Sequence, residues 1–303
     1  MTLTARPLPA PLGRGARIGI AALSGTPDPT RLSEGVAVLE SAGYRVVLAP
    51  NLERRVGYLA GSDRERLAGL DTLLAAGVDA IIAARGGYGL MRVLDGLPWD
   101  RLAAWGGWLV GFSDFTALHA AAGGRLPVAT LHGPVGTTLA RDGAGAAALV
   151  RWLEGTPPRT LFRFRPDRVV RPGMASGVAV GGNLSLLAAL AGTPYEPAYA
   201  DAVLFIEDVG EAGYRLDRLL TQLSLSSRLA RVKAIIVGQM VRCGRGEPGW
   251  RERWRALLAE TAPATAVVVD GVAFGHGSTN TPFPVGAPVS VDTTRGLVAW
   301  GGE

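Results

Sequence analysis

A serine at the end of an apolar run is the residue of this sequence that is best placed to act as a nucleophile. Residues 109–116 read Leu-Val-Gly-Phe-Ser-Asp-Phe-Thr, so an expected strand ends at a glycine and Ser113 begins the turn into an expected helix at 114–122. A hydroxyl at such an elbow lies at the carboxyl edge of a sheet, next to helix N-terminal N–H groups that stabilise an oxyanion. Serine is also a preferred helix N-cap, so this motif alone predicts a nucleophile and a cap equally well.

Two segments farther along the chain carry groups that could activate this serine. Residues 205–211 end an apolar run in Glu207, and a carboxylate at a strand end can orient a histidine, although clustered acids more often lie in solvated turns. His276 lies between two glycines, which favours a mobile imidazole that takes and returns a proton near neutral pH; an ordinary surface turn is the alternative. The chain order of serine, acid and histidine is that of one class of serine hydrolases.

A glycine-rich segment and a second histidine are candidates for the same cleft. Residues 84–89, Ala-Arg-Gly-Gly-Tyr-Gly, follow an expected strand at 78–83. Glycines at a strand exit let the backbone approach a ligand, and the spacing matches neither a dinucleotide fold nor a P-loop. The segment therefore favours an oxyanion or backbone-clamp role, with a tight turn as the alternative. His132 also follows an apolar run and is a candidate to line the cleft.

Composition excludes several other classes of protein. The net charge is +5, but the basic residues are scattered and no recognition motif accompanies them, so we expect no nucleic-acid partner. A single cysteine and three widely spaced histidines predict neither a disulfide nor a metal site. No apolar run approaches bilayer length, and the short run at 18–23 predicts a first strand rather than a signal peptide. We therefore expect no membrane association and a cytoplasmic location.

The elements that must position these residues alternate between strands and helices. Up to about residue 135, near-continuous apolar strands alternate with helical segments, which predicts an α/β fold with a doubly wound, mostly parallel sheet. Residues 155–173 are rich in proline, glycine and arginine and are predicted to be a linker. We expect an N-terminal domain at 1–154 and a smaller C-terminal α/β domain with a mixed sheet at 174–303. The acid and the histidine would then come from the second domain and the serine from the first.

Taken in order, these segments resemble the LD-carboxypeptidases, a serine peptidase family that includes the microcin C self-immunity proteins. The resemblance runs over nearly the whole chain. Its motifs are Arg-Gly-Gly-Tyr-Gly at 85–89, Gly-Phe-Ser-Asp-Phe-Thr at 111–116, His-Gly-Pro at 132–134, Gly-Gly-Asn-Leu-Ser at 181–185, Gly-Thr-Pro-Tyr at 192–195, Ile-Glu-Asp-Val-Gly-Glu at 206–211, Tyr-Arg-Leu-Asp-Arg at 214–218, Gly-His-Gly at 275–277 and Pro-Val-Gly at 284–286. Phe112 and Phe115 stand where the family frequently has Tyr and Ile, a difference that should not disturb the chemistry.

The resemblance implies a role for each candidate residue. Ser113 would be the nucleophile, His276 the general base and acid, and Glu207 its orienting carboxylate. The backbone N–H groups of Gly87 and Asp114 would form the oxyanion hole. The family also implies a nucleophile domain like that of class I amidotransferases, a homodimer, and no metal or organic cofactor.

The function implied by the resemblance is release of the terminal D-alanine from the tetrapeptide of recycled cytoplasmic murein. A substrate with a free C-terminus needs a cation, for which Arg85 beside the glycine loop is a candidate, although it could equally form a structural ion pair. One alternative is a microcin C self-immunity type of hydrolase that cleaves a peptide–nucleotide or aminoacyl amide conjugate. A second alternative is a non-catalytic protein that holds an anion in the 85–89 loop. A metalloenzyme would be inhibited by chelators, and we do not expect such inhibition.

Overall fold

The first sheet is built mainly by the N-terminal half of the chain. In the computed structural model, which describes residues 3–301, it has six strands in the order β12-β5-β4-β3-β1-β2. The pairs from β5 to β2 are parallel, and β12 pairs with β5 in the antiparallel direction. The strands are β1 (Arg17–Ala21), β2 (Arg45–Leu48), β3 (Ala80–Ala83), β4 (Trp108–Gly111), β5 (Thr130–His132) and β12 (Phe283–Val285).

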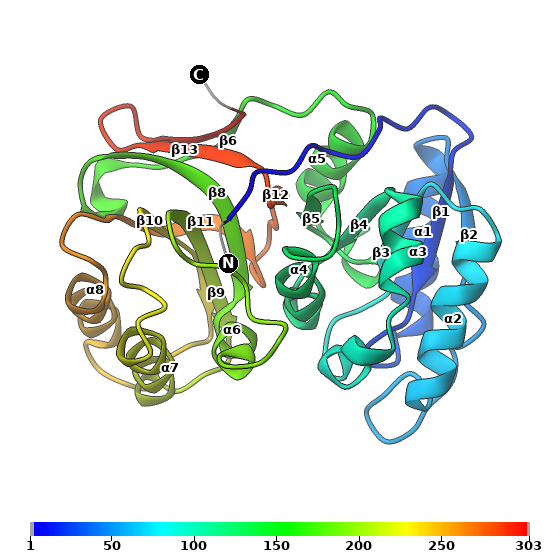
Figure 1. Ribbon diagram of the computed structural model, residues 1–303, viewed down its shortest axis with the longest axis horizontal. Coiled ribbons are helices and arrows are strands. Elements are labelled where there is room, and N and C mark those ends of the chain that lie inside the picture. The colour runs from blue at the N-terminus through cyan, green and yellow to red at the C-terminus, as the bar shows by residue number, and fades with distance from the viewer. Residues whose placement is uncertain (1–2, 302–303) are drawn as a thin grey trace.

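The central strands of this sheet are covered on both faces, as their apolar sequences predict. Ile18, Ile82 and Val110 have no exposed surface. The helices of this half are α1 (Pro29–Ser41), α2 (Asp63–Ala75), α3 (Trp99–Trp105), α4 (Thr116–Ala122) and α5 (Gly143–Leu153), and Figure 1 shows them alternating with the strands. Ser62 and Glu65 form a capping box at the start of α2.

The second sheet is mixed and has eight strands in the order β6-β14-β13-β8-β9-β10-β11-β7. Its central strands β8 to β11 are parallel, and antiparallel strands complete both sides. The strands are β6 (Thr160–Arg163), β7 (Val169–Arg171), β8 (Met174–Asn183), β9 (Ala202–Val209), β10 (Ala234–Val241), β11 (Val267–Gly275), β13 (Pro288–Asp292) and β14 (Leu297–Trp300). Its helices are α6 (Leu184–Leu190), α7 (Gly213–Leu225) and α8 (Trp250–Thr261), and short 3-10 helices include η1 (Leu90–Gly96), η2 (Ser113–Phe115), η3 (Gly136–Thr138) and η4 (Pro166–Arg168).

Residues 155–173 do more than connect the two halves. β6 pairs with β14 and β7 pairs with β11, so this stretch supplies two outer strands of the second sheet and is not only the linker that its composition predicted. The reason is that the two paired segments contain neither proline nor glycine, so their backbone groups can join the sheet. The C-terminal domain therefore has fewer residues than the N-terminal one but the larger sheet, and the domain limits 1–154 and 174–303 stay a prediction.

One strand crosses from the second half into the first sheet. β12 follows β11 in the sequence, yet Phe283 pairs with His132 and Val285 with Thr130 on β5. Figure 1 accordingly shows β12 between the two halves, close to β5. Because this pairing joins the segment after β11 to the first sheet, it limits how the two halves can move relative to each other.

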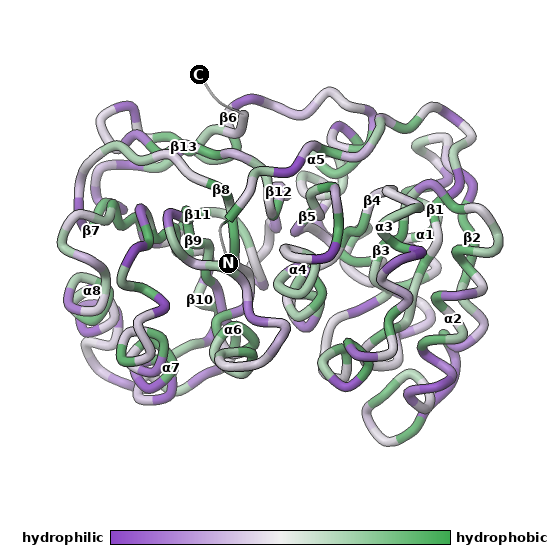
Figure 2. The backbone as a smooth tube through the Cα atoms, viewed as in Figure 1, coloured by the Kyte–Doolittle hydropathy of each residue, from purple (hydrophilic) through white to green (hydrophobic). Residues whose placement is uncertain are grey.

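The hydropathy of the residues follows the arrangement of strands and helices. Figure 2 shows hydrophobic stretches along the inner strands of both halves and hydrophilic stretches on the outer turns of α2, α7 and α8. Two clusters of buried side chains fill the structure, and the larger one contains residues of both halves, for example Phe115 and Phe274. None of the helices between residues 3 and 301 has the length and apolar character needed to cross a bilayer.

Candidate active site

Ser113 lies at a sharp turn directly after a strand of the first sheet. β4 ends at Gly111, Phe112 is extended, and Ser113 opens the short helix η2 with a φ of 63°. That left-handed conformation is costly for a residue with a side chain and persists only where the surroundings enforce it. Phe112 occupies the N-cap position of η2 and Ser113 is its first residue, so the serine is not the N-cap of this helix.

The three side chains predicted to act together meet at one place. His276 Nε2 lies 3.1 Å from Ser113 Oγ, and His276 Nδ1 lies 2.6 Å from Glu207 Oε2. Ser113 comes from the first sheet, Glu207 from β9, and His276 from the segment that follows β11. A hydroxyl, an imidazole and a carboxylate in hydrogen-bonding sequence can take a proton from the hydroxyl and stabilise the imidazolium that results.

The segment that carries His276 is anchored on both sides. The N–H of Gly275 donates to Asn280 Oδ1 over 2.9 Å, and the N–H of Asn280 donates to Asp142 Oδ2 over 2.7 Å. Asp142 is the N-cap of α5, so the histidine segment is attached to the first half of the molecule. Gly275 has a φ of 99°, and a Cβ atom there would lie 2.5 Å from Glu207 Oε2, so glycine is required at this position.

Glu207 is fully buried and has a second polar contact. Asn183 Nδ2 lies 3.4 Å from Glu207 Oε1 and 3.1 Å from Asp208 Oδ1, and Asp208 also accepts hydrogen bonds from the N–H and hydroxyl of Ser185. Asn183, Ser185 and Asp208 thus fix the carboxylate that faces His276. These residues belong to motifs of the sequence without a predicted role of their own, and an asparagine directly before a helix was the available signal.

The environment of His276 favours its charged form. Burial lowers the pKa of His276, but the hydrogen bond that its Nδ1–H donates to the Glu207 carboxylate and the negative charges of Glu207 and Asp208 raise it, while the positive charge of Arg242 lowers it. The net result is a pKa above the ordinary value of 6.5. An imidazole in this range exchanges a proton efficiently near neutral pH.

The glycine-rich loop at residues 85–89 passes directly beside Ser113. A Cβ atom added to Gly86 would lie 2.8 Å from Ser113 Cβ and 3.6 Å from the backbone nitrogen of Asp114. The N–H of Gly87 has no acceptor within residues 3–301, and the N–H of Asp114 lies in the first turn of η2, where such groups lack a partner in the helix. The two predicted oxyanion donors therefore directly follow Gly86 and Ser113 in the chain, and their role stays a prediction.

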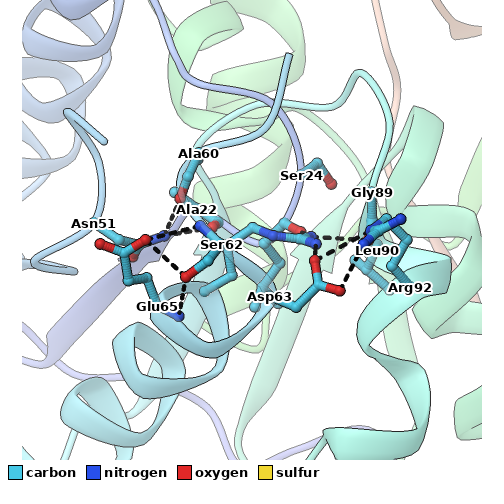
Figure 3. A network of polar contacts seen from close by, with 12 residues as sticks. Ala22, Ser24, Asn51, Ala60, Ser62, Asp63, Glu65, Gly89, Leu90 and Arg92 are labelled. Carbon is cyan, nitrogen blue, oxygen red and sulfur yellow. Dashed lines mark hydrogen bonds and ion pairs between the residues drawn. The ribbon is translucent and has the colours of Figure 1, made fainter. Parts of the chain in front are cut away.

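A buried polar network holds this loop in place. The Asp114 carboxylate accepts hydrogen bonds from the Ser24 hydroxyl over 2.6 Å and from the N–H of Leu90 over 2.8 Å. Burial raises the pKa of Asp114, and the two hydrogen bonds oppose that effect. The buried Arg66 donates to the carbonyl of Gly89 over 2.8 Å. Figure 3 shows the neighbouring contacts, with Asp63 bridging toward Arg92 beside Gly89 and Leu90.

A methyl group at Gly86 should displace the serine hydroxyl. In Gly86→Ala the new Cβ would lie within 2.9 Å of Ser113 Oγ, so one of the two groups must move. We expect about a 10²-fold slower reaction of Ser113 with a serine-directed acylating reagent, since misplacement of a reacting group by about 1 Å has that effect. Gly143→Ala is the matched control, because a Cβ at Gly143 meets nothing within 4 Å. Equal labelling rates in both variants would contradict this view of the loop.

The two candidates for substrate binding differ in their exposure to solvent. His132 has no exposed surface and stacks on Phe283, with ring centroids 4.6 Å apart, so it lies beneath the site and does not line the cleft. Burial lowers its pKa well below the ordinary value, as expected for a neutral core imidazole. Arg85 is exposed beside the glycine loop, and its Nη1 donates to the carbonyl of Thr26 over 2.9 Å.

No group of three or more histidine, cysteine, aspartate or glutamate side chains is arranged to hold a metal ion in the part of the chain that the structure describes. The other reactive side chain, Cys243, is buried, and burial raises its pKa to about 11. Its thiol is therefore a poor nucleophile compared with Ser113.

Family models match both halves of the chain. The model for the LD-carboxypeptidase N-terminal domain matches residues 18–133, and the model for the LD-carboxypeptidase C-terminal domain matches residues 176–291. Together they include Ser113, Glu207 and His276.

Individual relatives match over nearly the full length. A Streptomyces coelicolor protein whose name places it among the carboxypeptidases is 40% identical over 94% of each chain. The murein tetrapeptide carboxypeptidase of Pseudomonas aeruginosa is 33% identical over 85% of this chain and 87% of its own. The microcin C7 self-immunity protein of Escherichia coli is 24% identical over 94% of this chain and 93% of its own. The crystal structure of muramoyltetrapeptide carboxypeptidase from Oxalobacter formigenes is 27% identical, covers 94% of this chain and 98% of its own, and superposes with a TM-score of 0.82.

Proposed function

Because the chain belongs to the LD-carboxypeptidase family, we propose that it is a serine carboxypeptidase that releases the terminal D-alanine from murein tetrapeptide. The scissile bond would join the L-centre of the third residue to the D-residue. The observation that carries this proposal is the pair of contacts through His276, 3.1 Å to Ser113 Oγ and 2.6 Å to Glu207 Oε2. The names of the relatives at 33% and 27% identity support murein peptides as the substrate class.

The proposed mechanism is acyl transfer through Ser113. His276 Nε2 takes the proton of the Ser113 hydroxyl as Oγ attacks the scissile carbonyl, and Glu207 stabilises the imidazolium that forms. The N–H groups of Gly87 and Asp114 would hold the oxyanion, and each donor of this kind contributes about 3–4 kcal/mol in the transition state. His276 then gives its proton to the leaving amine, D-alanine departs, and water hydrolyses the acyl-enzyme with His276 again acting as base.

No cofactor takes part in these steps. In keeping with the family resemblance, we also propose a cytoplasmic location and a homodimer. The partner in the reaction is a peptide, and no nucleic acid or membrane enters the proposal.

The test is incubation with L-Ala-D-Glu-meso-diaminopimelate-D-Ala, followed by mass spectrometry. We expect loss of one D-alanine and no further shortening, since only one bond in this peptide joins an L-centre to a terminal D-residue. An aminoacyl-nucleotide amide in a parallel reaction tests the microcin C self-immunity alternative, and we expect slower turnover of it. Turnover of the nucleotide amide alone would replace the proposed substrate, and turnover of neither compound would refute the proposed function.

A further inference from the structure

A carboxypeptidase must recognise a free C-terminal carboxylate, and the three proposed catalytic side chains do not supply a cation for it. We propose that Arg242 binds the α-carboxylate of the leaving D-amino acid, an inference that rests on the function proposed above. It would make Arg242 the residue that restricts hydrolysis to the last peptide bond of the substrate.

Arg242 lies between the strands that carry the acid and the histidine. β10 pairs with β9 on one side and with β11 on the other. Met240 is opposite Asp208, the residue after Glu207, and Gln239 is opposite Gly275, the residue before His276. Arg242 follows directly after the end of β10 at Val241. It therefore lies at the carboxyl end of this sheet, on the imidazole side of the site.

The backbone of Arg242 is held in an unfavourable conformation. Its φ is 56°, in the left-handed region that residues with side chains rarely adopt. Hydrogen bonds fix the chain on both sides, from the N–H of Gly210 to the carbonyl of Val241 and from the N–H of Gly244 to the carbonyl of Glu211, each over 2.8 Å. Strain that is enforced in this way tends to occur at functional sites, and Ser113, across the site, has the same kind of conformation.

The guanidinium of Arg242 is available to a ligand. Its side chain is exposed, and within residues 3–301 it has no hydrogen-bond or ion-pair partner. The nearby Glu211 pairs instead with Arg215 over 3.4 Å. The positive charge of Arg242 is also close enough to His276 to lower the pKa of that imidazole.

The chemistry of the leaving group decides between Arg242 and Arg85. His276 must give its proton to the leaving nitrogen, so the leaving amino acid lies against the imidazole, and its carboxylate is only one carbon atom farther away. The required cation must therefore approach from the side of β10 and β11. Arg85 comes from the opposite half of the molecule and donates to the carbonyl of Thr26. A guanidinium at the Arg242 position can bind the carboxylate with two parallel hydrogen bonds.

The test compares the tetrapeptide with its C-terminal D-alaninamide, which lacks the negative charge. The wild-type protein should prefer the free acid, and Arg242→Gln should remove that preference by lowering kcat/KM for the acid about 10- to 100-fold, as expected for loss of a hydrogen bond between charged groups. In Arg242→Gln the loss should appear mainly as a higher KM for the acid, and turnover of the amide should stay unchanged. Arg242→Lys should retain part of the preference for the acid. Arg245→Gln, at an exposed arginine of the same loop, is the matched control for the loss of a positive charge.

The following results would overturn the inference that Arg242 binds the carboxylate. If Arg242→Gln keeps the preference for the acid, or loses both substrates equally, Arg242 does not bind the carboxylate. If Arg85→Gln removes the preference instead, the cation is Arg85. A wild-type protein that cleaves neither peptide would refute the proposed function itself, and this separates the two failures.

Discussion

Ser113→Ala is expected to lower kcat for D-alanine release by about 10⁶-fold, the size of loss seen when the nucleophile of a serine hydrolase is removed. The physical reason is that, among the described residues, Ser113 supplies the one hydroxyl that makes a hydrogen bond with His276 Nε2, over 3.1 Å. Mass spectrometry of the tetrapeptide after long incubation measures the residual rate. Labelling by a fluorophosphonate should be lost in the same variant.

Ser278→Ala is the matched control, because Ser278 is an exposed serine two residues after His276 and should leave the rate unchanged. Ser113→Gly adds a second measurement. It removes the same hydroxyl but also relieves the positive φ of 63°, so it should be more stable than Ser113→Ala by about 1 kcal/mol. A Ser113→Ala protein that still releases D-alanine at a comparable rate would show that the acyl-transfer mechanism is wrong.

Glu207→Gln is expected to lower kcat by about 10⁴-fold, as when the acid of a triad is replaced by its amide. The amide can present its NH₂ group to His276 Nδ1, which then holds the wrong tautomer for accepting the serine proton. The buried carboxylate also accepts from Asn183, so the side chain should stay in place and the protein should remain folded. Steady-state kinetics on the tetrapeptide, together with the thermal unfolding temperature, measures both effects.

The pH dependence of the same variant gives an independent check. The general base must be neutral, so kcat/KM falls as the pH drops through the pKa of His276. In the wild type the hydrogen bond donated by His276 Nδ1–H to Glu207 and the charges of Glu207 and Asp208 outweigh burial, which places this acid limb above pH 6.5. In Glu207→Gln two of the raising effects disappear, so the limb should move to lower pH. Asp208→Asn removes only a charge and should move it less; equal shifts in both variants would contradict the assignment.

Local patterns in the sequence were sufficient to predict the parallel sheet of the first half and several element ends. The apolar runs at 18–23 and 78–83 became β1 and β3. The same was true of the elbow at Ser113, since a glycine and a serine between an apolar run and a helical segment specify a strand-to-turn junction through contacts close in sequence.

Other features depend on contacts between residues far apart in the chain. His276 and Ser113 are separated by 163 residues, and β12 and β5 by about 150, so no periodicity of either segment specifies its partner. The burial of His132 follows from the packing of Phe283, which the β12–β5 pairing brings to it. The use of residues 155–173 as outer strands depends likewise on β14 and β11.

The sequence by itself therefore determined which chemical groups were present and which ends of strands would carry them, because these depend on neighbours within a few residues. The tertiary structure alone decided that Ser113, His276 and Glu207 meet, and that His132 lies below the site. It also decided that Arg242, unpaired among the described residues, follows the strand that pairs with the histidine-bearing one and that its charge acts on the imidazole. Those outcomes depend on how two sheets pack against each other, and packing is set by the shapes of side chains contributed from the whole chain.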